Sequence, residues 1–202
     1  LQGMLRLKEA ELEETLKETE AKLQRVKARL SQIEKENQPT NIDVVVKLIE
    51  VQPVLSIREV ISTPDQVEHL FRETAIVVME QGVDLVNAPL TIFHDPEFKE
   101  TDLDVEIAYP IRSKKDQAIP LANERQLTTR ILEEITTAAS TIHVGAYDNF
   151  SETYTALADW IDTNGYQIVG QPREIYLRPP SPDEEPLTEI QYPIAKKGEN
   201  DG

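Results

Sequence analysis

The feature that most constrains this fold is an internal duplication with an offset of 83 residues. Residues 44–111 align with residues 127–194 without a gap. Turn residues, apolar helix positions and strand ends all match at this one offset, which indicates a repeated structural unit. The clearest matches are DVEIAYPI (104–111) with LTEIQYPI (187–194), Gly82 with Gly165, Pro89 with Pro172, Ala75 with Ala158, Phe71 with Tyr154, Lys47 with Arg130 and Glu50 with Glu133.

Each half predicts the same order of elements: two strands, a helix and two further strands. In the first half these are one bent strand or two at 44–49 and 54–61, a helix from 62–65 to 80, and strands near 90–94 and 103–109. In the second half they are 127–135, 141–144, a helix at about 150–163, 174–177 and 187–194. The predicted fold is therefore α+β: two β-β-α-β-β copies, repeat 1 at about 42–113 and repeat 2 at about 125–196, related by a pseudo-twofold axis. We expect a ligand site in a cleft between the copies.

Residues 1–38 predict a long helix that precedes the second domain at 39–202. Residues 1–36 hold no proline, and two seven-residue ladders run through them with the three-and-four offset of a coiled-coil seam. The ladders are Leu16, Leu23 and Leu30, and Leu5, Leu12, Thr19, Val26 and Ile33. We expect this helix to pair with that of a second chain; the alternative is an amphipathic helix packed on its own domain.

Composition excludes several classes of function. The chain has no cysteine, so it forms neither a disulfide nor a thiolate metal site. It has no apolar run long enough to span a membrane and no signal-peptide pattern, so we expect a soluble, cytoplasmic protein with no membrane partner. Residues 1–36 carry eight basic and eight acidic side chains, so the net charge of −16 resides in the rest of the chain. A domain this acidic repels nucleic-acid phosphates and attracts cations.

The stretch REIYLRPPSPDEEPLTEIQYPI (173–194) predicts two short strands joined by a proline-rich loop. Because alternate residues of a strand share a face, Glu174 and Tyr176 point the same way. In the second strand Glu189 and Gln191 share a face. If the two strands pair with their apolar faces together, Glu174, Tyr176 and Glu189 gather on the other face. Such a cluster favours a site that a cation visits.

Several stretches together resemble the MerR-type transcription regulators of the BmrR-like, multidrug-sensing branch. The helix LRLKEAELEETLKETEAKLQRVKARL is similar to their dimerisation helix. The domain after it resembles their GyrI-like effector-binding domain, through KLIEVQPVLSIRE, HVGAYDNF, ALADWIDTNGY, EIYLRPP and TEIQYPI. The order and spacing of these pieces are more specific than any one of them. The chain starts at Leu1 rather than at a methionine, so we interpret it as a piece of a longer protein. The DNA-reading winged helix that precedes the dimerisation helix in that family is absent from this sequence, and two alternatives stay open: the domain was removed, or it was never present.

The resemblance implies one ligand cavity, in which aromatic walls and buried acidic residues take up bulky lipophilic cations. It also implies a homodimer through the N-terminal helix, and contact with DNA only through the absent upstream domain. Carried over by motif, Glu174 takes the position of the central buried carboxylate, and Glu189 that of a second acid nearby. Tyr176 shares the face of Glu174. The positions of wall residues are Ile161 and Tyr166, with Trp160 and Tyr147 as further candidates.

Each of these residues also has an ordinary structural interpretation. Glu174 could pair with Arg173 or Arg178 or face solvent. Glu189 matches Glu106 of the first repeat and could be structural for that reason. Packing is the simplest role for Trp160 and Tyr154, which have helical spacing, and for Tyr109 and Tyr192, which precede prolines. The histidines lack the spacing of metal ligands, so we expect no metal and no cofactor; they are His69, His94 and His143.

Three functions are compatible with these residues. The leading interpretation is the ligand-sensing and dimerising part of a transcription regulator, which is not an enzyme. The second is a hydrolase, because some GyrI-like proteins resemble hydrolases that use a Glu and a Tyr in the same cavity. Its residues would be Glu174 or Glu189 with Tyr147 or Tyr176. The third is a protein-binding module that acts through the acidic surface. The long helix argues against a free-standing enzyme.

Overall fold

The computed structural model describes residue 22 and residues 42–95, 99, 101–112 and 118–198. The chain divides into two units, Leu1–Asn41 and Ile42–Gly202. We call the second unit the body. The predicted coiled-coil helix at 1–38 lies outside the described residues, except for Lys22.

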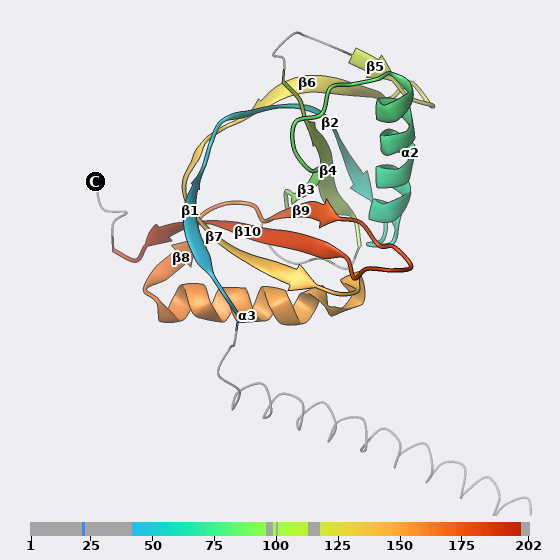
Figure 1. Ribbon diagram of the computed structural model, residues 1–202. Helices are drawn as coiled ribbons and strands as arrows, with labels where there is room; N and C mark the ends of the chain where they lie inside the picture. The colour runs from blue at the N-terminus through green and yellow to red at the C-terminus, as the bar shows by residue number, and fades with distance from the viewer. Residues whose placement is uncertain (1–21, 23–41, 96–98, 100, 113–117, 199–202) are drawn as a thin grey trace, which may run out of the picture. The chain divides into compact units, whose positions relative to one another are not determined.

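The described part of the body is α+β, as predicted, with ten strands in one antiparallel sheet and two α-helices (Figure 1). The first half contains β1 (Val45–Ile49), β2 (Gln52–Ile61), α2 (Gln66–Glu80), β3 (Leu90–Phe93) and β4 (Leu103–Pro110). The short β5 (Ala118–Pro120) comes next. The second half contains β6 (Gln126–Leu132), β7 (Ile135–Val144), the 3₁₀ turn η1 (Tyr147–Asn149), α3 (Phe150–Thr163), β8 (Tyr166–Ile168), β9 (Arg173–Arg178) and β10 (Leu187–Lys196).

The repeat is visible in the element boundaries. β2 begins at Gln52 and β7 at Ile135, 83 positions later, and each strand has 10 residues. The same offset relates β1 to β6, α2 to α3, β3 to β9 and β4 to β10. The pairing of β8 with β10, in which Ile168 meets Ile194, is repeated in the first half as a single bridge between Leu85 and Ile111. The sequence did not predict β5 or β8, because three residues are too few to show a strand pattern.

Two predicted strand boundaries are wrong. The strand expected at 141–144 begins at Ile135, and the strand expected at 127–135 ends at Leu132. The start of β7 has the sequence ITTAAS, in which Ala138 and Ala139 carry little strand propensity and interrupt the pattern of the β-branched residues. Pairing with β1 on one side and β10 on the other holds these residues in the sheet.

Two residues after the end of each α-helix lies a glycine in the left-handed region of backbone conformation. Gly82 has a φ of 59° and Gly165 a φ of 80°. The Gly82 N–H donates to the Met79 carbonyl at 3.1 Å, and the Gly165 N–H to the Asp162 carbonyl at 3.2 Å. A side chain at such a φ is strained, so the matched glycines of the two repeats reflect a shared backbone requirement.

The two repeats exchange their first strands. β1 of the first half pairs with β7 of the second, and β6 of the second half pairs with β2 of the first. The strand order is β1-β7-β10-β9-β3-β4-β2-β6-β5, with β8 paired to β10. In the middle of this order β3 meets β9, and there Thr91 is paired with Glu174. Thr91 and Glu174 are also equivalent positions of the repeat, which places the pseudo-twofold axis between them.

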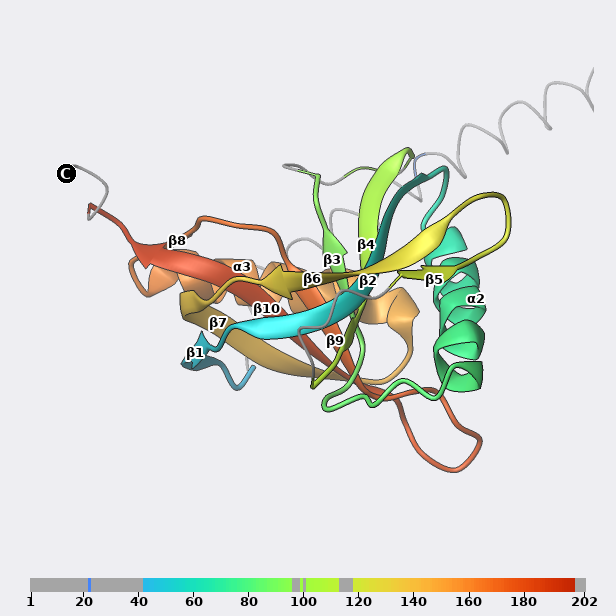
Figure 2. The same cartoon turned by 90° about the horizontal axis from the view of Figure 1, so that it is seen from above.

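The sheet has one face covered by helices and one that is not. The helix face carries Ile107 and Ile190 and packs against both α2 and α3. The inner face carries a separate apolar cluster that contains no helix residue. Figures 1 and 2 show that β1, β2 and β6 curve over the side of β9 and β10 that is opposite to α3. The inner-face cluster consists of Val54, Leu90, Ile92, Ala108, Leu132 and the partly buried Ile175.

Candidate functional site

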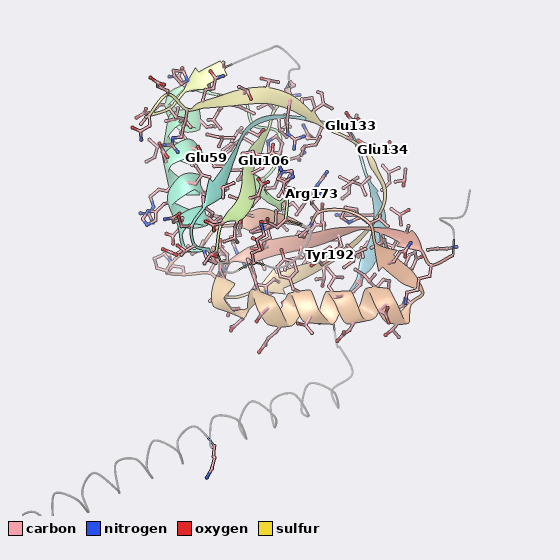
Figure 3. All side chains as sticks on the ribbon, turned by 180° about the vertical axis from the view of Figure 1, so that it is seen from behind. Glu59, Glu106, Glu133, Glu134, Arg173 and Tyr192 are labelled. Carbon is pink, nitrogen blue, oxygen red and sulfur yellow. The ribbon has the colours of Figure 1, made fainter. Side chains whose placement is uncertain are left out.

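Glu174 lies at the centre of the sheet with 5% of its surface exposed. A carboxylate at this depth ordinarily pairs with a cation, but no described residue forms an ion pair with it. Arg173 points to the inner face, where Figure 3 places it with Glu106, away from Tyr192 and α3. Arg178 donates to a loop carbonyl at 2.8 Å. Neither predicted arginine partner therefore neutralises Glu174.

Two tyrosines hold the Glu174 carboxylate. Tyr154 of α3 donates its hydroxyl to Oε1 at 2.8 Å, and Tyr176 of β9 donates to Oε2 at 3.0 Å. Oγ1 of Thr91 lies 3.0 Å from the Tyr176 hydroxyl. Because the Tyr176 proton goes to Glu174, Thr91 is the donor in that contact. Both repeats thus contribute to one hydrogen-bonded network at the seam between them.

Burial raises the pKa of Glu174 to about 7, although the hydrogen bonds from Tyr154 and Tyr176 act in the opposite direction. Burial and the neighbouring carboxylate also raise the pKa of both tyrosines well above its ordinary value, so they remain neutral donors. Near neutral pH the Glu174 carboxyl group is divided between its protonated and ionised forms. A cation placed beside it stabilises the ionised form.

Aromatic rings form a continuous row around this carboxylate, which we call the aromatic row. It begins on α2, crosses β9 and η1, and continues along α3 to β10. Ring faces carry negative electrostatic potential, so an apolar site lined by them attracts organic cations. The successive centroid distances are Phe71–Tyr176 5.2 Å, Tyr176–Tyr147 5.9 Å, Tyr147–Phe150 5.2 Å, Phe150–Tyr154 6.4 Å and Tyr154–Tyr192 5.8 Å.

The structure brings together three of the predicted ligand-binding residues: Glu174, Tyr176 and Tyr147. Tyr147 lies in η1, and 37% of its surface is exposed. Burial raises its pKa, and the charge of Glu174 adds to this effect. Tyr147 is thus the most exposed ring beside the carboxylate, and its role in binding stays a prediction.

The other predicted wall residues lie toward the opposite end of α3. The rings of Trp160 and Tyr166 stack on each other with a centroid distance of 6.3 Å and an interplanar angle of 11°. Ile161 is 2% exposed and belongs to the core beneath α3, together with Leu157 and Ile190. Among the described rings, neither Trp160 nor Tyr166 contacts the aromatic row. A role in ligand binding stays a prediction for these three residues.

Glu189 lies on the inner face, and the expectation that it gathers with Glu174 is wrong. The register of β9 and β10 pairs Glu189 with Ile175 and Glu174 with Ile190. Paired residues of neighbouring strands share a face, so the two carboxylates point to opposite sides of the sheet. Glu189 accepts a hydrogen bond from Lys47 Nζ at 2.5 Å in an ion pair. The apolar faces of the two strands are not on the same side, which was the condition for the predicted cluster.

A second buried carboxylate, Glu106, occupies the position of the first repeat that is equivalent to Glu189. Arg130 donates to it through Nε and Nη2, each at 2.5 Å, and His94 Nε2 lies 2.8 Å from Oε2. Burial alone would raise the pKa of Glu106, but the bonds from His94 and Arg130 lower it to about 2. Lys47 and Arg130 are equivalent positions of the repeat, as are Glu189 and Glu106. The same ion pair therefore occurs twice, each time between the first strand of one repeat and the last strand of the other. This network is satisfied internally.

The sequence interpretation did not assign four residues of the aromatic row to the site. Tyr154 and Tyr192 were expected to be packing residues. A signal for the α3 side was present, since positions 147, 150 and 154 have the spacing of one helix face. No local signal pointed to Phe71, because α2 reaches the row only through the tertiary fold. The four residues are Phe71, Phe150, Tyr154 and Tyr192.

The described residues contain no group of three or more His, Asp or Glu side chains arranged to hold a metal ion. Among the same residues, no helix is both long and apolar enough to cross a membrane. The candidate site therefore consists of one carboxylate, its phenol donors and the surrounding rings.

Residues 42–195 match the family model of the GyrI-like small molecule binding domain. The match covers well over half of the chain, so the chain belongs to this family of small-molecule binding domains. The GyrI-like resemblance found in the sequence is confirmed. No curated protein sequence matches the chain significantly.

Solved structures relate this domain to a regulator. The C-terminal domain of EcmrR, a MerR-family protein, is 28% identical with a TM-score of 0.67, covering 77% of this chain and 99% of that one. EcmrR in its DNA complex is 27% identical with a TM-score of 0.67, covering 92% of this chain and 69% of that one. A hydrolase from Listeria innocua shares the fold, with 12% identity, a TM-score of 0.52 and coverage of 82% and 97%. The family match favours ligand binding over the hydrolase interpretation.

Proposed function

We propose that this chain is the effector-sensing part of a MerR-type transcription regulator of the BmrR-like branch, and that a lipophilic cation binds beside Glu174. The observation that carries the proposal is a carboxylate that is 5% exposed, has a raised pKa and contacts two phenols but, among the described residues, no cation. A satisfied structural carboxylate looks different, as Glu106 does with its arginine and histidine. Glu174 lacks a counterion that a ligand can supply.

The site suits a cation that is large and apolar. Charge attraction to the ionised carboxylate gives the ligand its sign preference, and each ring face adds about 0.5–2 kcal/mol through cation–π contact. Rings discriminate weakly by shape, so several ligands of this class are expected to bind. Tyr147 is the most exposed ring of the row and contacts Tyr176, so its displacement is the simplest way for a ligand to enter.

Regulation requires that the ligand distinguish two arrangements of the protein. The likeness to EcmrR, whose structure includes DNA, supports a proposed role in transcription. In this proposal the residues at 1–38 form a homodimer through a coiled coil, and DNA is contacted by a domain upstream of Leu1. The acidic body itself contributes no DNA contact, because its charge repels phosphates.

The test is calorimetry of the full chain with tetraphenylphosphonium. Wild-type protein is expected to bind in the micromolar range, and Glu174→Gln is expected to weaken binding at least tenfold, because it removes the negative charge that the rings surround. Glu152→Gln is the matched control, since Glu152 is an exposed carboxylate on the first turn of α3 and its loss changes the net charge equally.

Glu189→Gln is a second comparison, because Glu189 was also predicted to bind the ligand and lies on the other face. We expect this variant to bind like the wild type. Equal affinity of wild type and Glu174→Gln would refute the proposed site. A loss in Glu189→Gln with no loss in Glu174→Gln would move the site to the inner face.

A further inference from the structure

The hydroxyl of Thr188 is buried and has no hydrogen-bond partner among the described residues. Thr188 lies in β10 with 1% of its surface exposed. Within the described part of the chain, its Oγ1 is the one buried side-chain polar atom without a partner. A native fold satisfies nearly all such atoms, and each exception needs a physical explanation.

The register places Thr188 beside the Glu174 site. Thr188 is paired with Tyr176 on β9 and with His143 on β7, so it lies on the helix face. Glu174 is paired with Ile190, two residues further along β10, which makes Thr188 its diagonal neighbour. Diagonal neighbours in an antiparallel pair are about 7–8 Å apart.

The polar groups next to Thr188 are already engaged. The Tyr176 hydroxyl donates to Glu174 and lies 3.0 Å from Oγ1 of Thr91. His143 uses both ring nitrogens, with Nδ1 2.7 Å from the Thr153 hydroxyl and Nε2 3.1 Å from a backbone carbonyl. These neighbours therefore leave Thr188 unsatisfied, and the fold bears the cost of an unpaired hydroxyl.

We propose that Thr188 is a hydrogen-bonding subsite of the Glu174 site, selecting cations that carry a hydroxyl, amine or carbonyl group one aromatic ring away from the charge. This inference rests on the proposed function, because it assumes that the charged part of the ligand contacts Glu174. A hydroxyl both donates and accepts, so either kind of ligand group pairs with it. A ligand with this group gains a hydrogen bond and removes an unsatisfied one from the protein.

The test compares tetraphenylphosphonium with its mono-hydroxyphenyl analogues, the meta and para isomers, against wild type and Thr188→Val. Wild type is expected to bind the better-placed isomer about tenfold more tightly than the parent cation. Thr188→Val is expected to lose this preference and to bind the parent somewhat more tightly, because valine fills the same space without an unpaired hydroxyl.

Thr141→Val is the matched control. Thr141 is also a buried threonine of the helix face, on the neighbouring strand β7, but its hydroxyl donates to the Asp43 carbonyl at 2.9 Å. Thr141→Val is expected to lower the melting temperature and to keep the preference for the hydroxylated ligand. Thr188→Val is expected to leave the melting temperature equal or higher.

The outcomes separate the two proposals. If the parent cation binds through Glu174 but Thr188→Val keeps the full hydroxyl preference, the subsite is wrong and the proposed function stands. A drop in melting temperature for Thr188→Val, comparable to that of Thr141→Val, shows an internal partner and also overturns the subsite. If neither the parent nor the analogues bind to wild type, both proposals fall.

Discussion

The two repeats place different chemistry at equivalent positions. In the second, Glu174 on β9 accepts hydrogen bonds from Tyr154 and Tyr176. In the first, the position of Glu174 is occupied by Thr91 and that of Tyr154 by Phe71. At these two positions, therefore, the second repeat places a buried carboxylate and a phenol, whereas the first repeat has only neutral side chains without a carboxylate.

The last strands of the repeats show the same contrast. Tyr109 on β4 is 2% exposed, and burial raises its pKa to about 12. The Tyr109 hydroxyl lies 2.7 Å from the Thr74 hydroxyl and donates to the Phe71 carbonyl at 3.2 Å. The equivalent residue of the second repeat is Tyr192, which packs in a cluster with Leu157. Leu157 occupies the position that Thr74 has in the first repeat, and no described residue forms a comparable hydrogen bond with the Tyr192 hydroxyl. The first repeat therefore pairs the hydroxyl of its terminal tyrosine internally, whereas the second repeat has no such bond to a described residue.

The largest expected effect is on how the free energy of unfolding depends on pH. The Glu174 carboxyl has an ordinary pKa of 4.5 in the unfolded chain and about 7 in the folded protein. Between these values the folded state holds the extra proton, so this group's contribution to stability falls as pH rises through the window, by about 3 kcal/mol in total. Glu174→Gln is expected to be more stable than wild type at pH 8 by that amount and similar at pH 4.5, measured by urea unfolding. A pH-independent difference would contradict the raised pKa.

A smaller effect is expected for Tyr154→Phe, which makes the second repeat resemble the first at this position. The variant loses a hydrogen bond to an ionised carboxylate, which contributes about 2 kcal/mol. The loss should be present above pH 7 and small near pH 5, where Glu174 is protonated. Unfolding measured at the two pH values checks this, and an equal loss at both would assign the hydroxyl to packing alone.

The smallest effects distinguish the two terminal tyrosines. Tyr109→Phe removes a buried hydrogen bond and is expected to cost about 1 kcal/mol. Tyr192→Phe is expected to change stability by less than about 0.5 kcal/mol, because no comparable bond to a described residue is lost. Thermal unfolding of the pair under one set of conditions makes the comparison, and equal losses would mean that the repeats do not differ in this way.

Local patterns in the sequence determined most of the elements. The repeat, the order of strands and helices and the shared face of Glu174 and Tyr176 all derive from periodicities of two or 3.6 residues and from turn residues. These signals act within a few residues, so the chain carries them before it folds.

Only the tertiary structure decided which strands pair and in which register. That register puts Glu189 on the inner face with Lys47, although the alternation along its own strand was predicted correctly. The same long-range pairing brings Tyr154 to Glu174 and leaves Thr188 unpaired between its described neighbours. A shift of one residue moves a side chain to the other face of a sheet, and nothing local to a strand sets that shift.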